Sequence, residues 1–226
     1  LGDVYKRQPD NTFYAEVTPD DVDEIVAKDL ITNETVKKLL YKNPITKETI
    51  QNSDQINFYK KQRKIALRNC GSINPEDIDD YIYHQGYKAL EKAVRMTSQE
   101  VVDIIKDSGL RGRGGGGFST GMKWQFALNN KADQKYVVCN ADEGDPGAFM
   151  DRAILEGDPH SIVEAMAICG YAIGANKGLV YIRAEYPLAV KILQMAIKAA
   201  KERGLLGKNI FNSGFDFDIE IKYGAG

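Results

Sequence analysis

The stretch that decides the fold is residues 135–147, Lys-Tyr-Val-Val-Cys-Asn-Ala-Asp-Glu-Gly-Asp-Pro-Gly. Its first five residues, of which Tyr136 to Cys139 are largely apolar, predict a short buried strand. The remaining residues are acidic and turn-forming, and they predict a loop. Further strand patterns lie at 179–182 and 215–221, and helical patterns that begin near Asp158 and Pro187 separate the strands. This β-α-β-α-β order predicts a Rossmann-like α/β fold with a mostly parallel sheet and right-handed crossovers.

A helical N-terminal segment is expected before this alternation. Thr18-Pro19 and Asn74-Pro75 each precede an apolar pattern and predict the start of a helix. Thr97 and Glu100 form a capping-box sequence at the start of a third helix, which Gly109 would end. We therefore expect a helical connector over 43–96 and the α/β domain over 97–226.

A second informative stretch precedes the first strand. Residues 111–124 read Arg-Gly-Arg-Gly-Gly-Gly-Gly-Phe-Ser-Thr-Gly-Met-Lys-Trp. Glycines let the backbone adopt positive φ and lie close to a ligand, and successive free amides form an anion-binding concavity. Arg111, Arg113 and Lys123 add positive charge, and Phe118 and Trp124 offer flat surfaces for stacking. The combination favours a phosphate-bearing aromatic cofactor, which means a nucleotide, a dinucleotide or a flavin.

Two common phosphate-binding motifs fit this loop poorly. A Walker loop fails because Met122 stands where a lysine is required after Gly121. The spacing Gly112-x-Gly114-x-x-Gly117 matches the dinucleotide fingerprint, but that fingerprint needs a preceding strand and the residues before this loop read as a helix. A flexible linker is the plain alternative, and the charged and aromatic residues among the glycines count against it.

The loop after the first strand offers polar groups for a cofactor. Asn140 carries donors and acceptors suited to an imide edge or a carboxamide, whereas Asp142, Glu143 and Asp145 are acceptors for hydroxyl or ring N–H groups. The acidic lining would repel a 2′-phosphate, which weakly favours NAD over NADP. A solvated turn is the alternative, because these residue types are also ordinary turn residues. Beside the glycine loop, the two interpretations are about equally supported.

Composition narrows the function classes. The formal charge of −2 and the scattered lysines do not favour a nucleic-acid partner. Long apolar runs and a signal peptide are absent from the sequence, so we expect a cytoplasmic location without direct membrane insertion. Cys70, Cys139 and Cys169 are widely spaced and are expected to be reduced thiols. These residues predict no metal site.

The two loops together closely resemble a known family. Residues 108–118, 120–121, 123–124 and 140–143 resemble the NADH-binding flavoprotein subunit of respiratory complex I, a module that also occurs in NAD-linked hydrogenases and formate dehydrogenases. Residues 67–71 and 144–152 look more like the β-subunit of soluble, often electron-bifurcating, hydrogenases. The resemblance covers about residues 12–226.

The resemblance implies an NADH dehydrogenase module, an NAD(H)-dependent FMN oxidoreductase subunit. NADH would pass a hydride to FMN, and single electrons would then reach the iron–sulfur clusters of a multisubunit complex. The family places the phenylalanines matching Phe118 and Phe126 near the nicotinamide nucleotide. It places the lysine matching Lys123 and the residues matching Asn140, Asp142 and Glu143 against the flavin. Asp145 matches a position that is often Glu in complex I. We expect no catalytic side chain and the following cofactor-binding residues: Gly112, Arg113, Gly114, Gly115, Gly117, Phe118, Lys123, Phe126, Asn140, Asp142, Glu143 and Asp145.

The resemblance also implies partners and boundaries. Residues 9–42 resemble the tail of a thioredoxin-like iron–sulfur domain, and residues 1–8 are expected to be non-native sequence. The family's clusters would belong to the full-length protein without ligands from these residues. The expected partners are a thioredoxin-like iron–sulfur subunit and further electron-transfer, hydrogenase or formate dehydrogenase subunits. Two alternatives stay open: a nucleotide-binding module without redox activity, and an inert fragment of the redox subunit.

Overall fold

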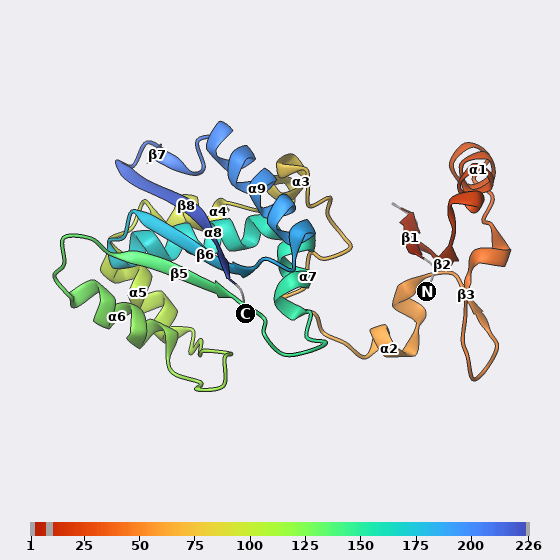
Figure 1. Ribbon diagram of the computed structural model, residues 1–226, viewed down its shortest axis with the longest axis horizontal. Coiled ribbons are helices and arrows are strands. Elements are labelled where there is room, and N and C mark those ends of the chain that lie inside the picture. The colour runs from red at the N-terminus through yellow and green to blue at the C-terminus, as the bar shows by residue number, and fades with distance from the viewer. Residues whose placement is uncertain (1–2, 8–10, 225–226) are drawn as a thin grey trace. The chain divides into compact units, whose positions relative to one another are not determined.

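The computed structural model describes residues 3–7 and 11–224, which form two compact units (Figure 1). Unit 1 is Leu1–Ile65 and unit 2 is Ala66–Gly226. The boundary between the units falls inside the expected connector. The expectation that residues 1–8 are non-native stays a prediction; of these, residues 1, 2 and 8 lie outside the described part of the chain.

Unit 1 is built from two small antiparallel hairpins and short helices. The hairpins pair β1 (Asp3–Arg7) with β2 (Thr12–Val17), and β3 (Tyr41–Lys42) with β4 (Thr49–Ile50). The helical elements are η1 (Pro19–Asp21), α1 (Val22–Glu24), η2 (Ile25–Ile31), η3 (Lys37–Leu39), η4 (Ser53–Gln55) and α2 (Asn57–Lys60). Their shared core contains the buried side chains of Tyr14, Ile25, Val36, Leu39 and Leu40.

The predicted helix start at Thr18-Pro19 is confirmed. The Asp21 carboxylate accepts hydrogen bonds from the Thr18 amide at 3.1 Å and the Thr18 hydroxyl at 2.7 Å. These bonds and the adjacent Lys38, whose ammonium lies 3.0 Å from the carboxylate, lower the pKa of Asp21 to about 2.

Unit 2 is an α/β domain, as predicted. Its sheet contains β5 (Tyr136–Ala141), β6 (Lys177–Arg183), β7 (Gly207–Ile210) and β8 (Phe215–Gly224) in the order β5-β6-β8-β7. The first three strands in this order run parallel, whereas β7 pairs antiparallel with β8. The helices are α3 (Ile78–Tyr83), α4 (Lys88–Ala93), α5 (Ser98–Asp107), α6 (Thr120–Asn129), α7 (Met150–Gly157), α8 (Pro159–Ile173) and α9 (Pro187–Glu202).

The first parallel strand differs from its prediction in two respects. It continues to Ala141, so Asn140 is a strand residue rather than a loop residue. It is also an edge strand with one exposed face, on which the side chain of Val138 is 62% exposed. Helix α8 packs against β5, β6 and β8 and buries the alternate residues such as Val137 and Ala141. An apolar run alone does not reveal which of its residues a helix layer covers.

Two helix starts in unit 2 test the capping predictions. Helix α5 follows Thr97, and the Glu100 carboxylate accepts from both the amide and the hydroxyl of Thr97 at 2.7 Å, so the capping box is confirmed. Helix α3, in contrast, begins at Ile78, which is four residues after Asn74, and its N-cap residue is Asp77. The Asn74 side chain accepts from the Glu76 amide at 3.1 Å and forms a local turn, which is the common alternative for asparagine.

One cluster of positive charge departs from the expectation of scattered lysines. Residues 60–64 read Lys-Lys-Gln-Arg-Lys, and the whole run is exposed at the end of unit 1. A run of this length stays in solvent because burial of unpaired charges is costly.

Candidate cofactor site

The two predicted loops lie at the same end of unit 2. Because β5, β6 and β8 are parallel, their carboxyl ends share one edge of the sheet. The acidic loop follows β5 at this edge. Figure 1 shows the glycine loop, in yellow-green before α6, at the end of the unit where the β5 arrow finishes. Ligands of open α/β sheets bind outside the carboxyl ends of the strands.

The glycine loop is a small hairpin with a closed base and an open tip. The Gly112 amide donates to the Phe118 carbonyl at 2.9 Å, and the Thr120 amide donates to the Leu110 carbonyl at 2.9 Å. Arg111 donates from Nε to the Gly117 carbonyl at 2.7 Å, so this side chain braces the hairpin. Gly115 has a φ of +100° and needs glycine for conformational reasons.

Gly114 and Gly116 need glycine for neither conformation nor internal packing. Neither residue has a positive φ, and a Cβ atom built on either would meet no heavy atom within 4 Å. Protein contacts therefore leave one face of this backbone open. A ligand lying against that face would account for both glycines, because a side chain there would displace it.

Helix α6 places its amino end, a lysine and a phenylalanine ring beside the loop. Its amino end is capped by Ser119, whose hydroxyl accepts from the Met122 amide at 3.4 Å, and a helix amino end favours anions. The Lys123 side chain is exposed on the first turn of this helix. The rings of Phe118 and Phe126 are 53% and 58% exposed, and their centroids lie 6.4 Å apart.

Trp124 does not join this aromatic pair. It is partly buried and packs against the core clusters that also contain Val102 and Ala172. Part of the Trp124 side chain is therefore used in packing, and the expectation that it offers a stacking surface stays a prediction. Residue type alone does not show which side of a helix carries a neighbouring helix.

Gly121 has a packing role that the sequence-based reasoning missed. A Cβ atom on this residue would lie 2.5 Å from the backbone nitrogen of Lys106 in α5. The glycine therefore lets α5 and α6 approach closely. An isolated glycine within a helical pattern is the signal that indicates such a packing constraint.

The first polar residues of the acidic loop are arranged around the end of β5. The Asn140 side-chain oxygen accepts from the Asp142 amide at 3.1 Å, while the Asn140 side chain stays exposed. Asp142 has one buried carboxylate oxygen that no described group satisfies. Buried acceptors are normally hydrogen-bonded, so this oxygen is a candidate contact for a bound ligand. Asp145 is exposed, and its carbonyl accepts from the Ala148 amide at 3.0 Å.

Glu143 is directed toward the protein. Its carboxylate accepts from the backbone amides of Met150, Asp151 and Arg152 at 2.6, 3.1 and 3.2 Å, which caps the amino end of α7. Partial burial, and then the nearby Glu143 charge, raise the pKa of Asp151. In this arrangement Glu143 shapes the loop, and its predicted contact with a cofactor stays a prediction.

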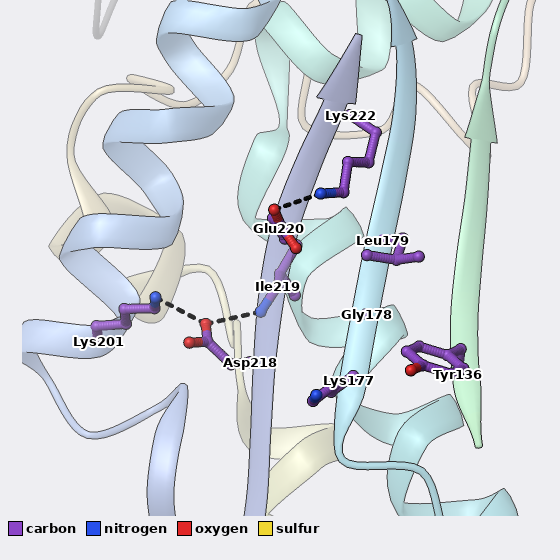
Figure 2. A pocket seen from close by; sticks show the side chains of 9 residues that line it. All are labelled: Tyr136, Lys177, Gly178, Leu179, Lys201, Asp218, Ile219, Glu220 and Lys222. Atoms are coloured by element: carbon purple, nitrogen blue, oxygen red, sulfur yellow. Dashed lines mark hydrogen bonds and ion pairs between the residues drawn. The ribbon is translucent and has the colours of Figure 1, made fainter. Parts of the chain in front are cut away.

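A pocket on the sheet lies away from both loops. Its volume is about 580 Å³. Figure 2 shows nine residues that line it: Tyr136, Lys177, Gly178, Leu179, Lys201, Asp218, Ile219, Glu220 and Lys222. Tyr136, Lys177 and Asp218 are neighbours in register near the amino ends of the three parallel strands. An ion pair at 2.7 Å between Lys201 and Asp218 occupies part of the lining.

The three cysteines are partly buried and form no disulfide with one another, and the Cys70 thiol donates to the Ala153 carbonyl at 3.6 Å. Burial raises the pKa of the Cys139 thiol to about 11 and that of Cys169 to about 12, so both thiols stay protonated at neutral pH. Residues 3–7 and 11–224 contain no group of three or more His, Cys, Asp or Glu side chains arranged to hold a metal ion. No helix within the same residues has both the length and the apolar character needed to span a bilayer.

A comparison with known families matches residues 105–226 to the Nuo51 FMN-binding domain, and this region contains both loops and all of the sheet. The chain belongs to this family. The family resemblance inferred from the two loops is therefore confirmed.

The curated relatives are longer than this chain. It is 72% identical over 167 residues to the NADP-reducing hydrogenase subunit HndC of Solidesulfovibrio fructosivorans, covering 74% of this chain and 34% of the relative. It is 53% identical over 162 residues to the F subunit of the NADH-quinone oxidoreductase of Aquifex aeolicus, covering 72% of this chain and 38% of the relative. The chain thus spans little more than a third of these relatives.

The solved structures support the fold. A crystal structure of an NAD+-reducing [NiFe]-hydrogenase in the air-oxidized state matches 95% of this chain and 32% of its own chain. The TM-score is 0.53 and the sequence identity is 24%, so this similarity concerns the fold alone.

Proposed function

We propose that the full-length protein is the NADH-oxidising flavoprotein subunit of a multisubunit oxidoreductase, and that unit 2 contributes to its FMN and NADH site. When bound, FMN supplies the chemistry that converts hydride transfer into single-electron transfer toward iron–sulfur clusters. The family match and the names of the relatives support this proposal.

The open face of the glycine loop is the observation that carries the proposal. At Gly114 and Gly116 the backbone has no protein atom against the face where a side chain would stand, and a ligand could bind against that face. In the proposed site, the loop amides and the α6 amino end would bind phosphate, and Arg113 and Lys123 would add positive charge. The exposed Phe118 and Phe126 rings would stack on the nucleotide.

The acidic loop would contact the polar edge of the bound molecules. Asn140, the unsatisfied oxygen of Asp142, and Asp145 would accept or donate hydrogen bonds there. This acidic lining favours NAD(H) as the nucleotide. NADP(H) is the necessary comparison, because one similar relative is named an NADP-reducing hydrogenase subunit.

The partners and the location are part of the same proposal. Several relatives are named as subunits of quinone oxidoreductases or hydrogenases. We propose a thioredoxin-like iron–sulfur subunit, with hydrogenase or formate dehydrogenase subunits as further partners, and a cytoplasmic location. The clusters would be held by the full-length protein and its partners.

The test is the visible spectrum of the full-length parent protein, recorded before and after NADH is added without oxygen. We expect a bound-flavin spectrum that bleaches with NADH, and a lower flavin content in the Lys123→Ala variant. Lys191→Ala, which removes an exposed lysine on α9, is the matched control. A colourless parent that still binds NAD would overturn the proposal in favour of a nucleotide-binding module. A yellow parent and a colourless chain 1–226 would show the present chain to be an inert fragment.

A further inference from the structure

One backbone carbonyl in the acidic loop is held by two side chains from the next strand–helix connection. The Glu143 carbonyl accepts from Arg183 Nη1 at 3.1 Å and from the Tyr186 hydroxyl at 3.3 Å. Arg183 is the last residue of β6, and Tyr186 immediately precedes α9. A carbonyl oxygen has two lone pairs, so the two donors satisfy its full capacity.

The two donors are themselves fixed in place. The Arg183 side chain is only 18% exposed, and its guanidinium also pairs with Glu185 at 2.7 Å. The guanidinium carbons of Arg183 and Arg152 lie 6.0 and 5.9 Å from the centroid of the Tyr186 ring, within the range of cation–π attraction. Arg152 belongs to α7 and Arg183 to β6, so the Tyr186 ring lies between the start of α7 and the end of β6.

Glu143 is thereby held at two points. Its carbonyl is bound by Arg183 and Tyr186, and its carboxylate is bound by the first amides of α7. The exposed residues 144–147 form the turn between these attachments. The contacts therefore determine where the polar groups of the loop point.

We propose that Arg183 and Tyr186 are positioning residues for the cofactor site, acting through the Glu143 carbonyl. The expected consequence is tighter cofactor binding, and this consequence rests on the proposed function. A loop held in its bound shape loses less conformational freedom when the cofactor binds, and affinity rises accordingly. Neither side chain needs to touch the cofactor for this effect.

The experiment uses the full-length parent protein and the variants Tyr186→Phe and Arg183→Lys. Tyr186→Phe removes one hydroxyl and keeps the ring between the two arginines. Tyr171→Phe is the matched control, because the Tyr171 hydroxyl donates to the Met96 carbonyl and its removal deletes the same kind of bond elsewhere in unit 2. Flavin affinity, the visible circular dichroism of bound flavin, and amide hydrogen exchange over residues 143–152 are measured for each protein.

We expect flavin to bind about three- to tenfold more weakly in Tyr186→Phe and Arg183→Lys, the effect of losing one hydrogen bond. The flavin dichroism should change, and amides 143–152 should exchange faster. Tyr171→Phe should leave all three readouts as in the unmodified protein. A merely structural role would lower thermal stability in all three variants without changing the dichroism or the local exchange.

The outcomes separate this inference from the proposed function. If the unmodified parent binds flavin and both variants match it in affinity and exchange, the positioning inference is wrong while the proposed function stands. If the unmodified parent binds no flavin, the proposed function fails, and local exchange alone then decides whether Arg183 and Tyr186 order the loop.

Discussion

At the scale of single residues, the most informative positions are those whose identity the protein's own contacts do not explain. Gly115 and Gly117 have positive φ values, so backbone conformation accounts for them. Gly114 and Gly116 have neither a positive φ nor a neighbour within 4 Å of a built Cβ atom. The unsatisfied oxygen of Asp142 belongs to the same class. These residues indicate a binding surface more directly than charge or composition does.

Gly114→Ala should separate ligand binding from stability. The added methyl group meets nothing in the protein, so we expect the free energy of unfolding to change by less than about 0.5 kcal/mol. Flavin affinity of the full-length protein should fall by about tenfold or more, because the methyl group would displace the cofactor from the backbone. Urea unfolding and flavin titration measure the two effects.

Gly115→Ala is the contrast within the same loop. Gly115 has a φ of +100°, which strains any residue with a Cβ atom. The alanine should therefore lower both the free energy of unfolding and the flavin affinity. Unchanged flavin affinity in Gly114→Ala would show that the open face of the loop is not the contact surface.

At the scale of elements, the close contact between α5 and α6 sets the position of the glycine loop. The loop connects these two helices, and α6 begins directly after it. The absence of a side chain at Gly121 allows the helices to approach at Lys106. The capping box of Thr97 and Glu100 fixes the start of α5. The position of the binding groups on the loop therefore depends on how α5 and α6 pack against each other.

Gly121→Ala should destabilise unit 2 although alanine is the better helix former. The new Cβ would lie 2.5 Å from the Lys106 nitrogen, and we expect a loss of about 1–3 kcal/mol from overpacking. Thermal unfolding of the full-length protein, followed by circular dichroism, measures the change. Met122→Ala, at the more exposed neighbouring position, should have the smaller effect. A more stable Gly121→Ala variant would contradict the packing argument.

At the scale of the whole unit, a buried polar network ties the segment before α5 to helix α8. The Glu164 carboxylate accepts from the Tyr81 hydroxyl at 2.7 Å and from the amides of Tyr87 and Leu90 at 2.9 and 3.1 Å. The Tyr87 hydroxyl lies 2.8 Å from His160 Nδ1. Burial, and then the Glu164 charge, raise the pKa of Tyr87 far above its usual range, so this hydroxyl stays protonated and can donate to a neutral imidazole.

The stability of unit 2 should therefore depend on pH through His160. Burial lowers the pKa of His160 to about 4, below its value of 6.5 in an unfolded chain. Between these values the unfolded state binds the additional proton, so stability is full above pH 6.5 and falls as the pH decreases toward 4. The loss is about 3 kcal/mol over this window, and the raised pKa of the buried Asp158 opposes part of it at the acidic end.

Urea unfolding at several pH values from 7.5 to 4.5 measures this dependence. His160→Gln should reduce the slope. If that variant does not fold, NMR titration of the unmodified protein gives the answer, because the chain has only two histidines. Proton uptake by folded His160 near pH 6.5 would contradict the prediction.

Much of the α/β domain was predictable from the sequence, because the spacing of apolar residues and the preferences of turn residues depend on neighbours along the chain. The strands at 136–141, 177–183 and 215–224, the helices after Asp158 and Pro187, and the capping box at Thr97 all follow from such patterns. The two loops were sufficient to identify the family. Strand β7 was missed because its few residues carry no clear alternating pattern.

What the sequence by itself determined was the order of the elements, the mostly parallel sheet and the two loops that carry the candidate binding residues. Only the tertiary structure decided how individual residues are used: Trp124 packs partly buried against the core, Gly121 lets two helices approach, Val138 is exposed on an edge strand, and Glu143 caps α7. The physical reason is that periodicity and turn preference depend on neighbours along the chain. Burial, helix approach and hydrogen-bond partners depend on residues that are distant along the chain, such as Lys106 for Gly121 and Glu164 for Tyr81, and only the folded chain brings these together.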